Sequence, residues 1–327
     1  MVKAIQMAQK GGRQVSPNPL VGALVIKGSR LISSGYHSYF GGPHAEIIAL
    51  KKAGKKSRGA TLYVTLEPCA SWGKTPPCVD RVIASGVKKV IIASEDPNPQ
   101  NRRKGILKLK NAGIKVRVGV LKDKVKEQNE GFFSVHRKGL PFVTLKMAQS
   151  LDGKIATKTG KSRWISSSAS RKFVHELRDS ADAVLVGKGT AFTDNPRLAG
   201  TRNGEKPWRV VIDPRLQLSP KARIFQGPQL TFIAVSEKII GKEKKGSRIL
   251  IPLPEKRGKL SLKPLLKRLA GLGVNHLLVE GGGEIAWSLI SEGLADRLIW
   301  IMSPKIIGGR GAKTSVEGEG AGELSRA

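Results

Sequence analysis

Four residues in the first quarter of the chain have side chains that can bind a metal ion and move a proton: His44, Glu46, Cys69 and Cys78. An imidazole nitrogen and two thiolates suit a single Zn²⁺ ion, and three protein ligands leave the fourth tetrahedral position open for water. Glu46 lies two residues after His44, close enough to transfer protons to and from that water. The sequence therefore predicts a catalytic zinc site rather than a structural one.

The order of these residues is typical of zinc-dependent nucleobase deaminases, whose signature is His-x-Glu followed by Pro-Cys-x-x-Cys. Here Pro68 precedes Cys69, but eight residues rather than two separate Cys69 from Cys78. The competing interpretation is a buried cysteine pair beside an unrelated surface His-x-Glu. A predicted strand before Pro68 and a predicted helix from Cys78 favour the metal site over that interpretation.

Length and composition indicate an ordinary two-domain α/β protein. The chain has 327 residues, 39% of them hydrophobic and 5% aromatic, which is enough for two separate cores. No apolar stretch approaches the roughly 20 residues that span a bilayer, and the N-terminus lacks the apolar region of a signal peptide. We therefore expect a cytoplasmic protein whose two cysteines bind metal instead of forming a disulfide.

The net charge is unusual. The chain has 58 Lys and Arg against 25 Asp and Glu, which gives +33. Such a charge attracts phosphates, including those of nucleic acids. The lysines are scattered along the whole chain and do not form one stripe with interleaved aromatic residues, so we expect a generally basic surface without a dedicated nucleic-acid site. A basic deaminase acting on RNA remains the alternative.

In the first part of the chain, β-branched runs alternate with amphipathic segments, which predicts helices on both faces of a sheet. The expected strands span 20–26, 61–65, 89–93 and 115–120. The expected helices span 45–53, 78–85 and 105–112, with glycine C-caps at Gly54, Gly86 and Gly113. This arrangement places His44 and Cys78 at helix starts, where the helix dipole favours a thiolate.

A domain boundary is expected at 137–141, so that the first domain covers residues 1–138 and the second covers 141–327. In the second domain, strands are expected at 142–147, 183–186, 208–212, 230–235, 276–279 and 297–302. Helices are expected at 168–178, 262–272 and 284–291. The Gly/Glu-rich segment 315–323 is expected to be poorly ordered.

The run from Thr65 to Cys78, together with segments 16–22 and 95–99, resembles the bifunctional deaminase–reductases of riboflavin biosynthesis. The resemblance implies a cytidine-deaminase-like three-layer α/β/α domain that acts on 2,5-diamino-6-ribosylamino-4(3H)-pyrimidinone 5′-phosphate. It also implies that five residues bind this substrate, namely Asn18, His37, Lys74, Asp96 and Asn98. Ser71 departs from the family, which usually has a histidine at that position, and this places substrate affinity in question.

The resemblance continues through segments 142–146, 150–156, 162–166, 187–190, 194–196 and 279–283. It implies a dihydrofolate-reductase-like α/β domain in which NADPH reduces the ribosyl ring to ribityl. The implied cofactor residues are Ala148, Trp164, Thr190, Asp194, Gly282 and Gly283. The implied substrate residues are Lys146, Ser162, Arg178, Leu198, Glu280 and Arg202, the last lying one residue later than in the family.

Gly281 to Gly283 follow an expected strand and open an expected helix, where backbone N–H groups can approach a pyrophosphate. They do not form Gly-x-Gly-x-x-Gly, which argues against a Rossmann domain. The chain stops soon after Gly309, whereas members of the family continue, so we expect the second domain to be incomplete at its C-terminal end. An exposed sheet edge there would favour self-association into a homo-oligomer.

Two further interpretations compete with a bifunctional enzyme. The first is a monofunctional deaminase whose second domain has lost reduction. The second is a basic interaction protein with a relict metal site, which the intact ligand set and the adjacent Glu46 disfavour.

Overall fold

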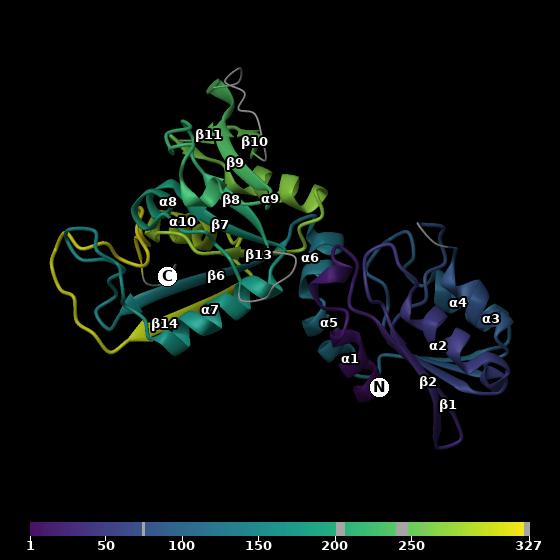
Figure 1. Cartoon of the computed structure of the whole chain (residues 1–327). Helices are drawn as coiled ribbons and strands as arrows, with labels where there is room; N and C mark the ends of the chain where they lie inside the picture. The colour runs from purple at the N-terminus through teal and green to yellow at the C-terminus, as the bar shows by residue number, and fades with distance from the viewer. Residues whose placement is uncertain (74–75, 201–206, 240–247, 257, 324–327) are drawn as a thin grey trace. The chain divides into compact units, whose positions relative to one another are not determined.

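The computed structural model describes residues 1–73, 76–200, 207–239, 248–256 and 258–323 (Figure 1). The chain divides into two compact units, Met1–Leu140 and Pro141–Ala327, and each is described by itself. Among the described residues, no helix is long and apolar enough to cross a membrane.

The first unit is built on a five-stranded sheet in the order β2-β1-β3-β4-β5. The strands are β1 (Gly22–Lys27), β2 (Arg30–Tyr36), β3 (Thr61–Leu66), β4 (Lys89–Ser94) and β5 (Lys115–Val118). β1 pairs antiparallel with β2 and β3, whereas β3, β4 and β5 are parallel. The carboxyl ends of β3 and β4 therefore meet at one edge of the sheet, where the loops that follow them lie side by side.

Helices cover both faces of this sheet (Figure 1). Their bounds are α1 (Val2–Gln9), α2 (Ala45–Ala53), α3 (Cys78–Ala84), α4 (Lys104–Asn111), α5 (Lys122–Gln128) and α6 (Glu130–Lys138). α2, α3 and α4 share one hydrophobic core with β1, β3 and β4. The helices contribute side chains that include Ala49, Val82 and Leu109. The glycines expected to end helices, Gly54, Gly86 and Gly113, all have positive φ angles, as the C-cap prediction requires.

The second unit contains a seven-stranded, wholly parallel sheet in the order β10-β9-β8-β7-β13-β6-β14. These strands are β6 (Phe142–Ser150), β7 (Ala183–Gly187), β8 (Trp208–Ile212), β9 (Thr231–Ser236), β10 (Arg248–Leu253), β13 (His276–Val279) and β14 (Arg297–Ser303). β11 (Glu255–Lys256) and β12 (Lys259–Leu260) form a small separate pair. The helices are α7 (Ser168–Ser180), α8 (Lys188–Asp194), α9 (Leu262–Gly271) and α10 (Gly283–Ser291).

Every strand and helix expected from the sequence is present, within a few residues at each end. The sequence analysis missed several elements, among them β2, α8 and β10. The prediction for segment 315–323 was wrong over its first residues. Ser315 is buried and donates its N–H to the Gly153 carbonyl, and the Glu317 N–H donates to the Gly283 carbonyl.

Gly35 allows α2 to lie directly on β2. A Cβ atom at Gly35 would lie 2.4 Å from the Ala45 carbonyl oxygen and 2.7 Å from the Ala49 nitrogen. Because real Cβ contacts are never so short, an alanine there must displace α2, whose start carries His44 and Glu46. The close approach at Gly35 therefore links sheet packing to the site described below.

We expect Gly35→Ala to destabilise the first unit by about 1–3 kcal/mol, the usual cost of overpacking, and to reduce bound zinc per chain. Denaturant unfolding and metal analysis of the purified variant measure both effects. The control is Gly271→Ala in α9, where an added Cβ meets no atom within 4 Å. Unchanged stability together with full zinc content in Gly35→Ala would contradict the prediction.

Candidate active sites

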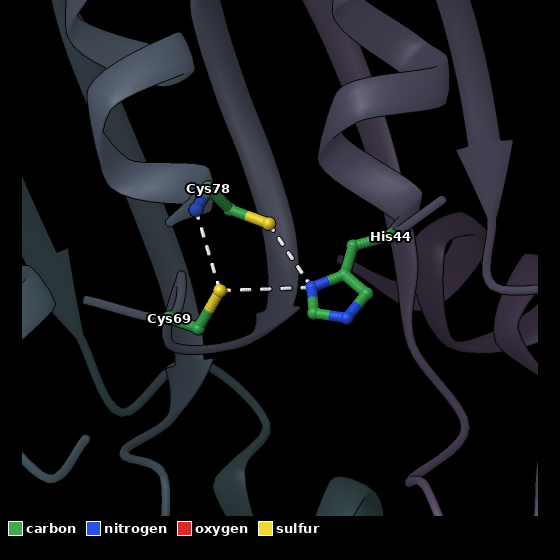
Figure 2. A group of neighbouring side chains, drawn as sticks. All are labelled: His44, Cys69 and Cys78. Atoms are coloured by element: carbon green, nitrogen blue, oxygen red, sulfur yellow. Dashed lines mark hydrogen bonds between the residues drawn. The ribbon is translucent and has the colours of Figure 1, made fainter. Parts of the chain in front are cut away.

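His44, Cys69 and Cys78 point toward one another in the first unit (Figure 2). The Nδ1 atom of His44 lies 3.0 Å from the Cys78 sulfur and 3.7 Å from the Cys69 sulfur. All three ligand atoms lie within 4.8 Å of one another, which suits tetrahedral ligands around one zinc ion. The structure thus brings together the three residues that the sequence predicted to bind metal.

Two helix starts and one loop position these ligands. His44 is the N-cap residue of α2, and Cys78 is the first residue of α3. Cys69 lies in the loop that follows β3, and its sulfur accepts a hydrogen bond of 3.3 Å from the Cys78 backbone N–H. A free N–H at a helix start stabilises a thiolate, which is the form that binds metal.

The electrostatics of the three ligands favour a cation between them. Hydrogen bonding from Cys78 and the neighbouring charge of His44 lower the pKa of Cys69 to about 4 despite its burial. The hydrogen bond to Cys69 raises the pKa of His44 to about 9. The hydrogen bond with Cys69 and burial raise the pKa of the Cys78 thiol. Two adjacent thiolates repel each other, and a divalent cation between them stabilises both.

Glu46 lies in the first turn of α2, beside the ligand cluster, with 3% of its surface exposed. Its Oε2 atom is buried and has no hydrogen-bond partner in the part of the chain that the structure describes. Burial raises the pKa of Glu46, and the charge of His44 opposes that rise. An unpartnered carboxylate oxygen at this position suits a group that exchanges protons with a water molecule or substrate.

Asn18 and His37 form a hydrogen-bonded chain that ends next to His44. Asn18 Nδ2 lies 3.0 Å from His37 Nε2, and His37 Nδ1 lies 3.1 Å from the Pro43 carbonyl oxygen. The amide nitrogen of Asn18 can only donate, so His37 accepts at Nε2 and carries its proton at Nδ1. Its ring meets that of His44 edge-on, with centroids 5.3 Å apart, and burial lowers the pKa of His37. His37 is therefore a neutral ring that lies between Asn18 and His44.

Asp96 is buried in the loop that follows β4, and Asn98 lies in the same turn. The Oδ1 atom of Asp96 accepts from the Asn98 backbone N–H at 2.9 Å, and Oδ2 accepts from Asn101 Nδ2 at 3.0 Å. Burial raises the pKa of Asp96 to about 6, although both hydrogen bonds oppose the rise. The sequence analysis missed Asn101 because no local pattern marks it. The remaining candidate, Lys74, lies outside the described residues.

Glu67 is a second residue that the sequence analysis missed. It is buried, two residues before Cys69, and its carboxylate accepts from the backbone N–H groups of Asp96, Arg103 and Ile106 at 3.0–3.2 Å. Burial raises the pKa of Glu67, and these hydrogen bonds oppose it. The carboxylate ties the loop after β4 and the start of α4 to the loop that carries Cys69. The signal available in the sequence was an acidic residue directly before Pro68 and Cys69.

In the second unit, a cavity of about 600 Å³ brings together most of the reductase candidates. It lies at the carboxyl ends of β6, β7 and β13, the usual position for a ligand in a parallel sheet. The candidates that line it are Lys146, Ala148, Ser162, Trp164, Arg178, Thr190, Asp194, Leu198 and Glu280. The expected cofactor and substrate residues therefore share one cavity. Arg202 lies outside the described residues.

Glu280 is the centre of a buried ion-pair network in this cavity. Its carboxylate contacts Lys146 Nζ at 2.9 Å and the Arg178 guanidinium at 2.6 and 3.0 Å. Burial opposes ionisation, but the two cations and their hydrogen bonds outweigh it and lower the pKa of Glu280 to about 2. The network holds two cationic side chains at the cavity wall.

A second cavity of about 320 Å³ contains Gly282 and Gly283 at the start of α10, and it shares Ser162, Thr190 and Asp194 with the first. A Cβ atom at Gly282 would meet no atom, so the backbone there is open to a ligand. The first N–H groups of a helix have no partner within the helix and favour an anion. This arrangement fits a dinucleotide phosphate, and the shared residues connect that end to the larger cavity.

We expect His44→Ala, Cys69→Ser and Cys78→Ser each to abolish stoichiometric zinc, because each removes one of three protein ligands. The metal-free variants should also unfold at lower temperature, because zinc binding stabilises only the folded site. Metal analysis of purified protein, with and without a chelator, tests this. One zinc per chain retained in any of the three variants would contradict the ligand assignment.

The low pKa of Glu280 predicts how the stability of the second unit depends on pH. A carboxylate whose pKa falls from 4.5 unfolded to about 2 folded stabilises the fold above about pH 4.5. That contribution, on the order of 3 kcal/mol, is lost as the pH falls toward 2. We therefore expect the difference in unfolding free energy between wild type and Glu280→Gln to become smaller as the pH falls from about 4.5 to about 2.

Tryptophan fluorescence can follow unfolding of this unit, because Trp164, Trp208, Trp287 and Trp300 all lie in it. The matched control is Glu284→Gln, which removes an exposed pair with Lys259 and should change stability by less than about 1 kcal/mol. A gap for Glu280→Gln that stays constant from pH 5 to pH 2 would contradict the assignment of the network.

Sequence models of two families match the chain. "Cytidine and deoxycytidylate deaminase zinc-binding region" matches residues 1–94, and "RibD C-terminal domain" matches residues 141–325. The "Riboflavin biosynthesis protein RibD" of Aquifex aeolicus is 44% identical over 314 residues, which are 94% of this chain and 87% of that protein. The protein of the same name from Escherichia coli is 38% identical over 94% of this chain and 88% of its own length.

Solved structures agree with these matches. Acinetobacter baumannii RibD superposes with a TM-score of 0.89 at 34% identity, covering all of this chain and 91% of the other. A diaminohydroxyphosphoribosylaminopyrimidine deaminase/5-amino-6-(5-phosphoribosylamino)uracil reductase from Thermotoga maritima has a TM-score of 0.89 at 40% identity, covering 99% and 90%.

These findings confirm the predicted fold, with a cytidine-deaminase-like domain followed by a dihydrofolate-reductase-like domain. They also confirm an enzyme of riboflavin biosynthesis that combines a zinc-dependent deaminase with an NADPH-dependent reductase. The chain belongs to the RibD family of bifunctional deaminase–reductases.

Proposed function

We propose that residues 1–138 deaminate 2,5-diamino-6-ribosylamino-4(3H)-pyrimidinone 5′-phosphate, and that residues 141–327 then reduce its ribosyl group to ribityl with NADPH. The observation that carries the first step is the convergence of His44, Cys69 and Cys78 beside Glu46, whose Oε2 atom has no hydrogen-bond partner among the described residues. The Thermotoga maritima relative is named for the same two activities.

In the deaminase, His44, Cys69 and Cys78 would hold a zinc ion. Zinc, when bound, makes water nucleophilic at neutral pH. Glu46 takes a proton from the attacking water and delivers it to the departing amino group. The water oxygen replaces that group on the pyrimidine ring, and ammonia leaves. The buried position of Glu46 keeps its carboxylate away from bulk solvent, so that it exchanges protons with the reactants.

Substrate recognition is assigned to the polar side chains around the ligand cluster. Neutral His37 holds the Asn18 amide, which matches the donors and acceptors of the heterocycle. Asp96 accepts from ring or amino N–H groups, and Asn98 belongs to the turn that holds Asp96. Lys74 is assigned to the phosphate on the basis of the family resemblance.

In the reductase, NADPH supplies the hydride to C1′ of the opened sugar. Lys146 and Arg178 present fixed positive charge to the phosphorylated substrate, and Glu280 holds both in place. Ser162 and Leu198 complete that part of the larger cavity. The remaining candidates (Ala148, Trp164, Thr190, Asp194, Gly282 and Gly283) are assigned to the cofactor, with the two glycines at its phosphates.

The proposed partners are small molecules. The charge of +33 then serves to attract phosphorylated substrates and NADPH, and no nucleic-acid substrate is proposed. We place the reaction in the cytoplasm.

We expect Glu46→Gln to keep one zinc per chain but to reduce deamination by roughly 10²–10⁴-fold, because glutamine cannot move the proton. The assay follows ammonia release from the diaminopyrimidine phosphate. NADPH oxidation with the separately deaminated substrate should stay at the wild-type rate. Near-wild-type deamination by Glu46→Gln would exclude Glu46 as the proton-transfer group.

Glu127→Gln, at an exposed position of α5, is the matched control and should change neither activity.

The same assay separates the bifunctional enzyme from a monofunctional deaminase. A wild-type chain that releases ammonia but never oxidises NADPH with the deaminated product would overturn the reductase assignment alone.

A further inference from the structure

Asn101 joins the loop that carries a metal ligand to a carboxylate of the proposed substrate site. Its Oδ1 atom accepts from the Ser71 hydroxyl at 2.7 Å and from the backbone N–H groups of Ala70 and Ser71 at 3.2 and 3.3 Å. Its Nδ2 atom donates to Asp96 Oδ2 at 3.0 Å. Ala70 and Ser71 directly follow the ligand Cys69, so one amide spans the loops after β3 and β4.

The surroundings determine which way this amide points. Only an oxygen can accept from the three donors of the Cys69 loop, so the nitrogen must face Asp96. The Ser71 hydroxyl makes the shortest of these contacts and belongs to the residue that departs from the family pattern. In this structure the hydroxyl therefore stabilises Asn101.

The backbone of the turn has a second anchor besides Asn101. Glu67 already accepts from the backbone N–H groups of Asp96, Arg103 and Ile106 and so holds the turn against the Cys69 loop. The Asn101 side chain instead reaches the carboxylate of Asp96. One carboxylate oxygen is held by the Asn98 N–H and the other by Asn101, which fixes the plane of the group.

We propose that Asn101 is a positioning residue of the deaminase site, which orients the Asp96 carboxylate relative to the metal-binding loop, and that Ser71 keeps Asn101 in that orientation. Asn101 acts through Asp96 and does not itself contact the substrate. This inference rests on the proposed role of Asp96 in binding the pyrimidine. Preorganised carboxylates bind donors more tightly because they lose less freedom on binding.

The test compares Asn101→Asp with Asn101→Ala in the full chain. Aspartate keeps the acceptor toward Ser71 and the Cys69 loop but replaces the donor toward Asp96 with a repelling oxygen. We expect Asn101→Asp to raise KM for the diaminopyrimidine phosphate by about 10- to 100-fold, the usual effect of losing a hydrogen bond to a charged group. Zinc content and the reductase rate should not change. Asn101→Ala, which adds no charge, should raise KM in the same direction.

Ser71 is tested by substitution alone and in combination. Ser71→Ala should raise KM roughly threefold, as expected for one neutral hydrogen bond. Ser71→Thr keeps the hydroxyl and should restore the wild-type value. Ser71→Ala added to Asn101→Ala should have no further effect, because the two residues act through one interaction. Effects that multiply in the double variant would overturn the role given to Ser71.

The control for the new charge is Asn111→Asp at the exposed end of α4, which should leave KM unchanged. A merely structural role for Asn101 would lower zinc content, melting temperature and apparent kcat while leaving KM unchanged, and that result would overturn the proposal. Asp96→Asn tests the role of Asp96 separately from the role of Asn101. If it impairs deamination while both Asn101 variants do not, only the role of Asn101 fails; if Asp96→Asn is itself fully active, the proposed role of Asp96 fails.

Discussion

The first unit depends on an electrostatic constraint at the meeting point of α2, α3 and the loop after β3. Two thiols and an imidazole lie within 4.8 Å of one another, and they cannot all adopt their metal-binding forms without a cation between them. The contacts around them keep this arrangement in place. Gly35 lets α2 approach the sheet, and Glu67 holds the loop after β4 against the loop that carries Cys69.

The second unit stabilises its buried charge in a different way. Glu280 obtains its positive partners from the protein itself, since Lys146 and Arg178 pair with it directly. A buried charge that lost these partners would be costly, because the desolvation penalty would no longer be offset. The reductase cavity is therefore charged and ordered by its own side chains, whereas the deaminase site requires an ion from outside.

Local signals explain which parts of the fold were predictable. The helix at 45–53 and the helix starting at Cys78 follow from periodicity and from glycines that end helices, and such signals act within one or two turns. β2 was missed because its residues are half exposed and contain two adjacent serines, so no clear alternation appears. Most reductase candidates share one cavity because seven parallel strands bring their carboxyl ends to one edge.

The residue types alone predicted the chemistry. An imidazole and two thiols indicate zinc, and a carboxylate two residues from the imidazole indicates proton transfer. Which polar groups share hydrogen-bond partners depends on the three-dimensional fold. Asn101 lies 30 residues from Ser71, and Arg178 lies 102 residues from Glu280, so the order of the strands and the packing of helices on them, rather than local sequence, bring these residues together. The folded core also removes Glu46 from solvent, which leaves its Oε2 atom without a partner in the part of the chain that the structure describes.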